Sequence, residues 1–245
     1  MKSPEHRNFI ITIDGPAGSG KSTLARNLAR AFGITYLDTG ASYRALAIAA
    51  MREGTDLDDE TATAELVHRV EIELRPSPPP ERIERVFLYG NDITDQLSYN
   101  EVSIAASRIS RHPAVREAMV ALQRRIGLRV CESASDSENG SRPCLVAEGR
   151  DTGTIVFPEA RVKIFLTANI DERARRRTPD FSGTHASVEQ VRKQIETRDA
   201  SDTSRAVGPL KPAEDAVLID NTDFSQHQTL QKALEIILEK TGATP

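Results

Sequence analysis

A glycine- and lysine-containing run near the N-terminus constrains this chain more than any other feature. Residues 15–22 fit the pattern G-x-x-x-x-G-K-[ST] at every fixed position. Loops of this kind wrap backbone N–H groups around phosphate oxygens, and their glycines let the backbone come close to them. We expect the loop and the residue after it to hold the phosphates of a nucleotide: Gly15, Pro16, Ala17, Gly18, Ser19, Gly20, Lys21, Ser22 and Thr23.

The segments on either side of the loop support this interpretation. Residues 9–13 are apolar and β-branched, which predicts a buried strand, and residues 22–31 carry an apolar stripe typical of a helix. Strand, loop and helix then place the positive end of the helix dipole at the phosphates. Lys21 would face the outer phosphates and Ser22 would face Mg²⁺. A glycine-rich turn with a chance lysine is the alternative, and the matching context disfavours it.

Composition narrows the class of protein. The chain has 245 residues, 38% of them hydrophobic, and a net charge of −4. These values fit one α/β domain and argue against a general nucleic-acid-binding protein. No apolar run approaches a membrane span, and residues 1–8 are polar, so we expect neither a membrane anchor nor a signal peptide. We therefore expect a cytoplasmic protein in which Cys131 and Cys144 are free thiols, although they could approach each other.

Strands and helices alternate along the chain. This order predicts an α/β fold with a parallel sheet covered by helices on both faces. The further strands are expected at residues 34–37, 145–147, 162–166 and 216–219, with a hairpin near 86–93. The further helices are expected at residues 41–52, 60–70, 101–111, 114–130, 171–177, 188–197 and 230–238. Residues 132–142 are rich in Ser, Asp and Glu and predict a solvated loop.

Arginines follow two of the expected strands. Arg44 lies shortly after the strand at 34–37, and Arg150 follows the strand at 145–147. Ligands of parallel α/β sheets gather beyond the carboxyl ends of the strands, so both arginines should converge on the phosphate loop. Paired guanidinium groups there would suit a second phosphate.

Several longer motifs carry a resemblance to a known family. The matching segments are residues 13–22, 37–44, 106–107, 115–116, 148–158, 162–166, 171–177 and 198–207. The sequences Gly-Arg-Asp-x-Gly-Thr at 149–154 and Arg-Asp-x-x-Asp-x-x-Arg at 198–205 are the specific ones. On these residues the chain resembles the bacterial cytidylate kinases, a family of P-loop nucleoside monophosphate kinases.

The resemblance implies a domain plan. It implies a single P-loop NTPase-type domain over residues 1–245, with a small NMP-binding lobe, a short lid and a monomeric state. The core would comprise residues 9–70, 114–170 and 206–240, the NMP-binding insertion residues 71–113, and the lid region residues 171–205. The polar loop at 132–143 is longer than is usual in the family, and its role is open.

The resemblance also implies an activity. The chain would transfer the γ-phosphoryl group of ATP, with Mg²⁺, to CMP or dCMP; UMP or AMP as acceptor is the alternative. The implied catalytic residues are Lys21, Arg150, Arg205 and the lid arginines Arg173 and Arg177. The implied CMP-binding residues are Thr39, Tyr43, Arg44, Ser107, Arg116, Arg150, Asp151, Arg198, Asp202 and Arg205. A GTPase switch should carry an Asn-Lys-x-Asp motif, which this sequence lacks, and a non-catalytic sensor would not need this many arginines.

Hydrogen-bond chemistry supports the base-reading roles that the resemblance assigns. Cytosine has acceptors at N3 and O2 and a donor at its amino group, so Arg116 can donate, Asp151 can accept and Ser107 can do either. Uracil reverses part of this pattern and would leave buried groups unpaired. In the family, Arg44, Arg150 and Arg205 correspond to ligands of the acceptor phosphate, and Arg198 and Asp202 to contacts with the sugar.

Two arginine groups have alternative interpretations. The spacing of Arg198, Asp202 and Arg205 also suits an exposed salt-bridge ladder on a helix. The arginines at 173 and 175–177 could equally form a solvated helix face. The family motif favours ligand roles for both groups, without saying which lid arginines reach ATP.

Overall fold

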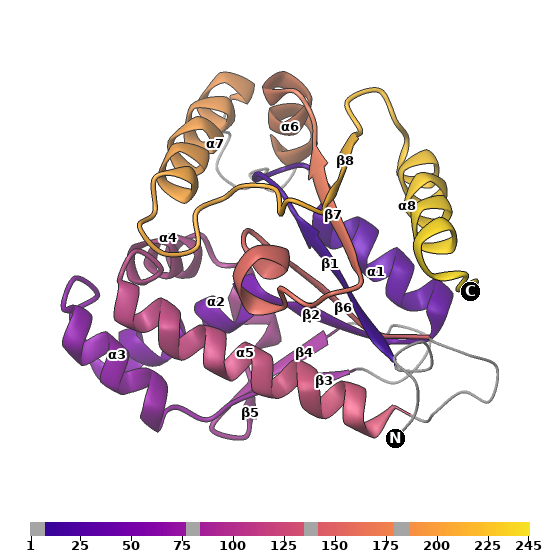
Figure 1. The fold of residues 1–245 in the computed structure, drawn as a ribbon. Helices are drawn as coiled ribbons and strands as arrows, with labels where there is room; N and C mark the ends of the chain where they lie inside the picture. Colours follow the sequence, from indigo (N-terminus) through magenta and orange to yellow (C-terminus); the bar gives the residue numbers. More distant parts are fainter. Residues whose placement is uncertain (1–7, 77–83, 135–141, 179–186) are drawn as a thin grey trace.

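A five-stranded parallel sheet forms the centre of the molecule (Figure 1). The structure is a computed structural model that describes residues 8–76, 84–134, 142–178 and 187–245. The strands lie in the order β2-β6-β1-β7-β8, and every neighbouring pair is parallel. Their bounds are β1 Phe9–Asp14, β2 Thr35–Asp38, β6 Pro143–Gly149, β7 Val162–Thr167 and β8 Val217–Asp220. All five carboxyl ends therefore meet at one edge of the sheet.

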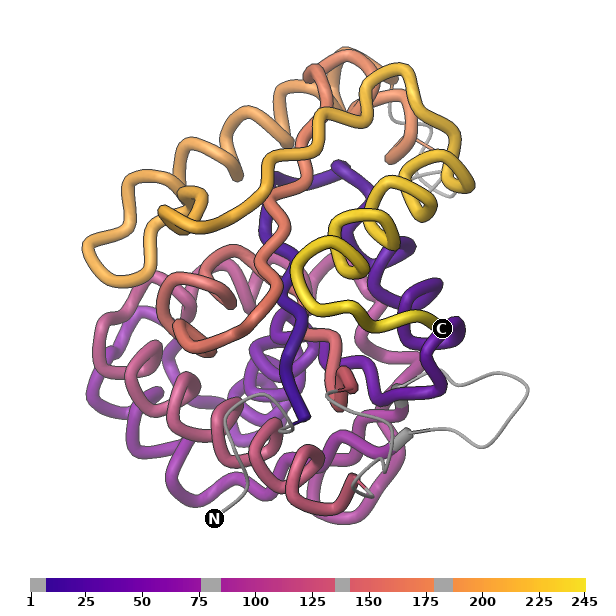
Figure 2. Tube along the Cα trace, turned by 45° about the vertical axis from the view of Figure 1, so that its right-hand side comes forward, coloured from indigo at the N-terminus to yellow at the C-terminus, as the bar shows by residue number. Residues whose placement is uncertain are grey.

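Helices cover both faces of this sheet, as the alternating pattern predicted. On one face, α1 (Lys21–Phe32) and α8 (Gln226–Thr241) pack on β1 and β7 around Leu28 and Ile237, both fully buried. On the other face, α5 (Pro113–Ser133) and a short π-helical turn, Thr152–Val156, pack on β6. Figure 2 shows α8 beside α1 from a second direction.

Helix ends follow local sequence signals. Pro113 begins α5, where its missing N–H costs nothing, and Gly33 ends α1 in the left-handed conformation. Ser225 and Gln228 form a capping box at the start of α8. These signals explain why the helices that carry site residues begin and end where they do.

A second group of elements packs beside the central sheet. It comprises α2 (Thr39–Glu53), α3 (Glu60–Arg69), α4 (Asn100–Ile109), the 3₁₀ helix Thr94–Ser98 and an antiparallel sheet of β3 (Ile72–Pro76), β4 (Glu84–Leu88) and β5 (Asn91–Asp92). One apolar cluster joins these elements to α5 and runs from Ala41 to Leu122. This second group of elements thus shares its core with residues on both sides of the expected 71–113 insertion. The boundaries of that insertion stay a prediction.

The expected lid region contains α6 (Ile170–Arg177) and α7 (Val188–Thr203). The α7 helix continues beyond the expected end at residue 197, so the whole Arg198–Asp202 segment is helical. Ala174, Val191 and Ile195 form a small apolar cluster with Ala17 of the phosphate loop. This cluster docks both helices on the loop.

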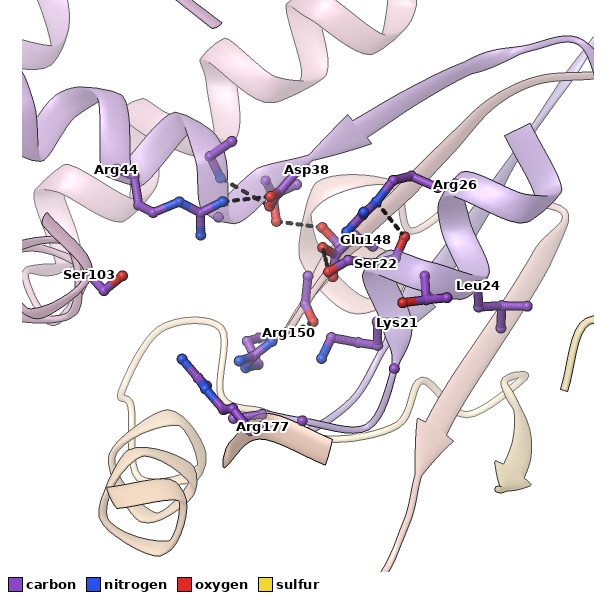
Figure 3. Close-up of a pocket in the computed structure, with 18 of the residues that line it drawn as sticks. Lys21, Ser22, Leu24, Arg26, Asp38, Arg44, Ser103, Glu148, Arg150 and Arg177 are labelled. Atoms are coloured by element: carbon purple, nitrogen blue, oxygen red, sulfur yellow. Dashed lines mark hydrogen bonds and ion pairs between the residues drawn. The ribbon is translucent and has the colours of Figure 1, made fainter. Parts of the chain in front are cut away.

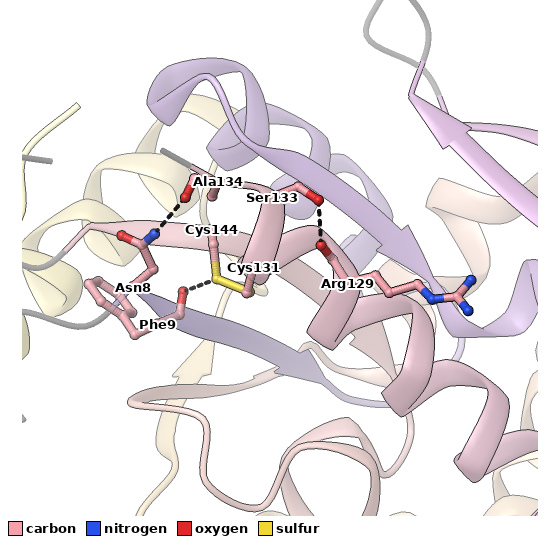
Figure 4. The surroundings of a disulfide bond; sticks show 7 residues. All are labelled: Asn8, Phe9, Arg129, Cys131, Ser133, Ala134 and Cys144. Atoms are coloured by element: carbon pink, nitrogen blue, oxygen red, sulfur yellow. Dashed lines mark hydrogen bonds between the residues drawn. A yellow bond between two sulfur atoms is a disulfide. The ribbon is translucent and has the colours of Figure 1, made fainter. Parts of the chain in front are cut away.

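The expectation of two free thiols is wrong. Cys131 and Cys144 form a disulfide, with their Cα atoms 5.1 Å apart (Figure 4). The α5 helix runs to Ser133, beyond the expected end at residue 130, and β6 begins already at Pro143, so the two elements bring the cysteines together. Of the polar loop, residues 135–141 lie outside the described residues, as do residues 179–186 of the lid region.

Within the described ranges, no helix has both the length and the apolar character that crossing a membrane requires.

Candidate active site

A cavity of about 1140 Å³ lies at the carboxyl edge of the sheet. Residues after β1, β2, β6 and β8 line it, together with side chains of α4, α5, α6 and α7. Most of the residues expected to bind ligands meet here: Ala17, Gly18, Gly20, Lys21, Ser22, Thr23, Thr39, Tyr43, Arg44, Ser107, Arg116, Arg150, Asp151, Arg177, Arg198, Asp202 and Arg205. The topology therefore gathers segments that are distant in sequence around one space.

The loop between β1 and α1 forms one wall of the cavity. Gly15 has φ +154°, and a Cβ atom there would overlap the carbonyl oxygen of Leu166 on β7, so only glycine fits. Asn221, just after β8, donates to the carbonyl of Ser19 at 3.1 Å. Gly15, Pro16 and Ser19 are buried and do not line the cavity. Contacts with Leu166 of β7 and with Asn221, just after β8, thus constrain the conformation of the loop.

Lys21 is buried in a positive environment. Its Nζ donates to the carbonyl of Pro16 at 2.8 Å. Burial, then the charges of Arg150 and Arg198, lower its pKa to about 7, against the opposing effect of Glu148. Figure 3 shows the charged ends of Lys21, Arg150 and Arg177 turned toward the same space.

Arg198 of α7 belongs to the same positive group. Burial and the charge of Arg150 lower its pKa to about 9, with smaller contributions from Arg177 and Arg44. Depressed pKa values at two basic groups mean that their protonated forms are poorly compensated by the protein. A bound polyanion such as a phosphate chain would supply the missing negative charge.

Two carboxylates pair with three of the arginines that line the cavity. Asp202 of α7, almost fully buried, accepts from Arg150 Nε at 2.7 Å and lies 2.5 Å from Arg205 Nη2. Asp38, at the end of β2, pairs with Arg44 at 2.6 Å. Asp202 thus joins α7 to the loop after β6, and the exposed ladder considered for the 198–205 segment is not what forms.

A buried ion pair also lines the cavity. Arg116 of α5 and Asp151 bond to each other, with only 2% and 10% of their side chains exposed. Arg116 Nε and the Tyr43 hydroxyl are buried without a hydrogen-bond partner among the described residues. The Tyr43 ring lies 5.8 Å from the Arg116 guanidinium, and burial raises the tyrosine pKa to about 12. This part of the cavity therefore offers a ligand the Asp151 carboxylate and two donors without a partner, Arg116 Nε and the Tyr43 hydroxyl.

Two hydroxyl residues have different settings. Thr39 donates its hydroxyl to the carbonyl of Glu148 at 2.8 Å, which ties the start of α2 to β6. Ser107 of α4 lines the cavity and is half-buried. Ser107 is thus open to a ligand, whereas the Thr39 hydroxyl proton is already used.

Arg173 lies apart from the other expected arginines. It does not line the cavity; its guanidinium donates to the carbonyls of Ala17 at 3.0 Å and Ala168 at 2.9 Å and pairs with Asp199. Asp199 in turn accepts from the backbone N–H of Ala17 at 3.1 Å. Side chains of α6 and α7 thereby hold both sides of one residue of the phosphate loop. Arg176 and Arg177 line the cavity instead.

Glu148 is a residue to which the sequence analysis gave no role. It lies on β6, buried, and accepts from the Ser22 hydroxyl at 2.7 Å and the Tyr36 hydroxyl at 3.1 Å. Its position at the carboxyl end of a buried strand was the available signal. Asp199 was also missed, although it belongs to the 198–205 motif, because its partners, the Ala17 N–H and Arg173, lie outside that motif.

The oxygen chemistry beside Ser22 fits a magnesium ion. Mg²⁺ prefers oxygen ligands and keeps several waters, so one hydroxyl and one carboxylate beside nucleotide phosphates suffice. Ser22 and Glu148 provide this pair of oxygens. Within the described ranges, no three acidic, histidine or cysteine side chains form a metal-binding group.

These features define the class of the protein. A parallel sheet with this loop at the carboxyl end of β1, and helices on both faces, is the P-loop NTPase-type α/β fold. The family model of cytidylate kinase matches residues 11–239. The chain belongs to the cytidylate kinase family.

Individual relatives agree with the family match. A cytidylate kinase of Geobacillus sp. (strain WCH70) is 42% identical, covering 96% of this chain and 99% of the relative. A cytidylate kinase of Pasteurella multocida is 41% identical over 94% of this chain and 95% of the relative. The chain is also 46% identical to part of a bifunctional pantoate ligase/cytidylate kinase of Trichormus variabilis, over 89% of this chain and 39% of that protein.

Proposed function

We propose that this chain transfers the γ-phosphoryl group of ATP to CMP or dCMP, giving ADP and CDP or dCDP. The observation that carries the proposal is one cavity with a poorly compensated positive centre and, beyond it, a buried Arg116–Asp151 pair. The positive centre suits the phosphates of two nucleotides, and the pair suits a cytosine edge. The family membership supports the same reaction.

ATP binds on the side of the phosphate loop. The backbone N–H groups of the loop surround its phosphates, and Lys21 neutralises the outer ones. Arg177 turns toward the same space as Lys21 and Arg150, so it can stabilise the negative charge that develops on the transferring phosphoryl group. Arg173 acts on this group only indirectly, because its side chain is committed to Ala17 and Asp199.

The acceptor binds on the side of the arginine–carboxylate network. Arg44, Arg150 and Arg205 bind its phosphate, and their carboxylate partners Asp38 and Asp202 keep the guanidinium groups in place. Arg198 and Asp202 face the sugar.

The cytosine base lies against Ser107, Arg116 and Asp151. Arg116 donates to N3 and O2, and Asp151 accepts from the amino group. UMP, the main alternative acceptor, would bring a carbonyl oxygen to the Asp151 carboxylate and is therefore disfavoured. Adenine also carries an amino group, so AMP is a necessary comparison.

The chemistry needs positioning and charge neutralisation. The acceptor phosphate already carries negative oxygens, so one of them attacks the γ-phosphorus directly, the bond to the leaving β-phosphate oxygen breaks, and no general base is required. Closure of α6 and α7 over the site excludes water and so protects ATP from hydrolysis.

Mg²⁺ fits this scheme as the companion of ATP. Ser22 and Glu148 would hold it, directly or through water, together with the nucleotide phosphates. When bound, the ion would neutralise part of the negative charge of the nucleotide phosphates.

The test is a steady-state assay of ADP release with ATP, Mg²⁺ and each of CMP, dCMP, UMP and AMP. We expect kcat/KM for CMP or dCMP to exceed that for UMP and AMP by at least about 100-fold, since a mismatched buried hydrogen-bonding edge costs several kcal/mol. A higher kcat/KM for UMP or AMP would assign the alternative acceptor. ADP release that is independent of every acceptor would refute the kinase proposal.

A further inference from the structure

We propose that Asp14 is a positioning residue for acceptor recognition, because it fixes the turn that presents Arg150 and Asp151 to the nucleoside monophosphate. This inference rests on the proposed function. Asp14 is the last residue of β1, directly before the phosphate loop, and its side chain is 4% exposed. Asp14 belongs to the 13–22 segment that carries the family resemblance, but it lies outside the phosphate-loop pattern at residues 15–22 and outside the motifs at 149–154 and 198–205.

The Asp14 carboxylate binds the turn after Asp151 through three hydrogen bonds. Oδ1 accepts from the Thr152 backbone N–H at 2.8 Å and from the Thr152 hydroxyl at 2.7 Å. Oδ2 accepts from the Gly153 backbone N–H at 2.7 Å. These N–H groups begin the π-helical turn Thr152–Val156 and have no partner within it, so the carboxylate of a distant strand caps the turn.

The shape of the turn makes room for this carboxylate. A Cβ atom on Gly153 would lie 2.8 Å from Thr12 Oγ1 and 3.3 Å from Asp14 Oδ2. Glycine at 153 therefore allows the backbone to reach the carboxylate. Thr152 is fully buried, so its hydroxyl has Asp14 in place of water.

The turn directly follows the two residues that we propose bind the acceptor. Arg150 and Asp151 immediately precede Thr152, and each points to a different partner: Arg150 to Asp202 and Asp151 to Arg116. Asp14 of β1 holds Thr152 and Gly153, the two residues after Asp151. Arg150, which binds the acceptor phosphate, and Asp151, which binds the base, therefore keep a fixed spacing. Loss of the cap would let this spacing relax, which weakens acceptor binding in particular.

Thr152 offers a matched pair of variants for the test. Thr152→Val keeps the shape and removes the hydroxyl that Asp14 holds, whereas Thr152→Ser keeps the hydroxyl. At saturating ATP, we expect T152V to raise the KM for CMP about five-fold, the effect of one lost hydrogen bond, and T152S to stay near wild type. The KM for ATP should change by less than about two-fold in both, since neither variant touches the phosphate loop.

Asp14→Asn tests the carboxylate itself. Its amide N–H₂ would face donors of the turn, so we expect a larger rise in the KM for CMP and a lower ratio of kcat/KM for CMP over UMP. Circular dichroism and melting temperature check folding. If D14N fails to fold, the Thr152 pair decides alone.

The outcomes separate this inference from the proposed function. Wild-type activity with CMP tests the proposed function, whereas the differences between T152V and T152S test Asp14. Equal KM values for CMP in T152V and T152S would overturn the positioning role, as would equal rises in the KM values for CMP and ATP in T152V. Calorimetric affinity for CMP without ATP repeats the comparison without turnover.

Discussion

Several residues of this site carry charges that burial disfavours. Lys21 and Arg198 have pKa values depressed to about 7 and about 9, because burial and neighbouring arginines disfavour their charged forms. Burial also disfavours the charged form of Asp14, but because Asp14 is an acid its pKa is raised, to about 6. Functional sites commonly carry such costs, which a ligand or a neighbour offsets.

Replacing Lys21 separates donor chemistry from acceptor binding. We expect Lys21→Ala to lower kcat by on the order of 10²–10³, as loss of a charge that stabilises the transition state does. CMP binding measured by calorimetry should stay near wild type, because the proposed function places Lys21 on the ATP side. Lys232→Ala on exposed α8 is the matched control and should behave as wild type. Near-normal turnover of the Lys21 variant would contradict the assignment of the phosphate loop.

Asp14 should also leave a signature in the pH dependence of stability. Its pKa rises from 3.8 to about 6 in the folded state, chiefly through burial. The folded state therefore binds this proton more tightly than the unfolded state. The stabilisation is complete below about pH 4 and is lost as the pH rises through 6.

The measurement is the free energy of unfolding by urea between pH 4 and 7, for wild type and Asp14→Asn. The wild type should lose about 2 kcal/mol across this interval relative to the variant, since a full pKa unit is worth about 1.4 kcal/mol and the unfolded state is already partly ionised at pH 4. Parallel pH profiles of the two proteins would show that Asp14 titrates normally.

At the scale of secondary-structure elements, α6 and α7 connect the two halves of the site. Arg173 and Asp199 hold the carbonyl and the N–H of Ala17 in the phosphate loop, while Asp202 on the same α7 helix holds Arg150 and Arg205. One helix thus contacts both the phosphate loop, where we propose that ATP binds, and the arginines that we propose bind the acceptor. Movement of α7 should change both.

We expect Asp199→Asn to weaken the ATP side more than the acceptor side. It removes the charge that pairs with Arg173 and loosens the hold on Ala17, so the KM for ATP should rise about ten-fold. The KM for CMP should rise less, because Asp202 remains. Asp171→Asn on α6, an exposed acid beside Arg192, is the control and should leave both KM values unchanged. A larger rise for CMP than for ATP would contradict the role of Asp199.

The disulfide joins the end of α5 to the start of β6, 13 residues apart in sequence. A cross-link closing a loop of this size stabilises by about 3 kcal/mol, or roughly 6–12 °C in Tm for a chain of this length. We expect dithiothreitol to lower the Tm of the wild type by that amount and to leave a Cys131→Ala/Cys144→Ala variant unchanged. Neither cysteine lines the cavity, so kcat/KM for CMP should be unaffected by reduction. An unchanged Tm of the reduced wild type would mean that the cross-link does not form in solution.

Local signals made much of the architecture predictable from sequence. The strand, loop and helix at residues 9–32 follow from apolar periodicity and glycine spacing, and the alternation of strands and helices predicted the parallel sheet. The disulfide was missed because it depends on where α5 ends and β6 begins, to within a few residues. The roles of Asp14 and Asp199 were missed because both bind backbone N–H groups of distant segments, which leave no residue pattern. The strand order likewise depends on long-range packing.

The whole molecule brings the carboxyl ends of the sheet, the lobe around α2 and α4, and the pair α6–α7 around one cavity. The phosphate-binding half of this cavity is common to many P-loop proteins. The acceptor half, with the Arg116–Asp151 pair between α5 and the loop after β6, gives the chain its specificity in our account. The most direct test therefore changes Asp151, the carboxylate that we propose recognises the base.

That test compares kcat/KM for CMP and for UMP, at saturating ATP, in wild type and Asp151→Asn, with folding checked by circular dichroism. The amide keeps an acceptor oxygen, loses the charge and gains a donor for uracil O4. One charge-assisted hydrogen bond is worth about 1.5–3 kcal/mol, so kcat/KM for CMP should fall by roughly 10–100-fold. The value for UMP should fall less, so the CMP/UMP ratio drops. An unchanged ratio, with equal losses for both acceptors, would mean that Asp151 serves only as the ion-pair partner of Arg116 and would contradict the account.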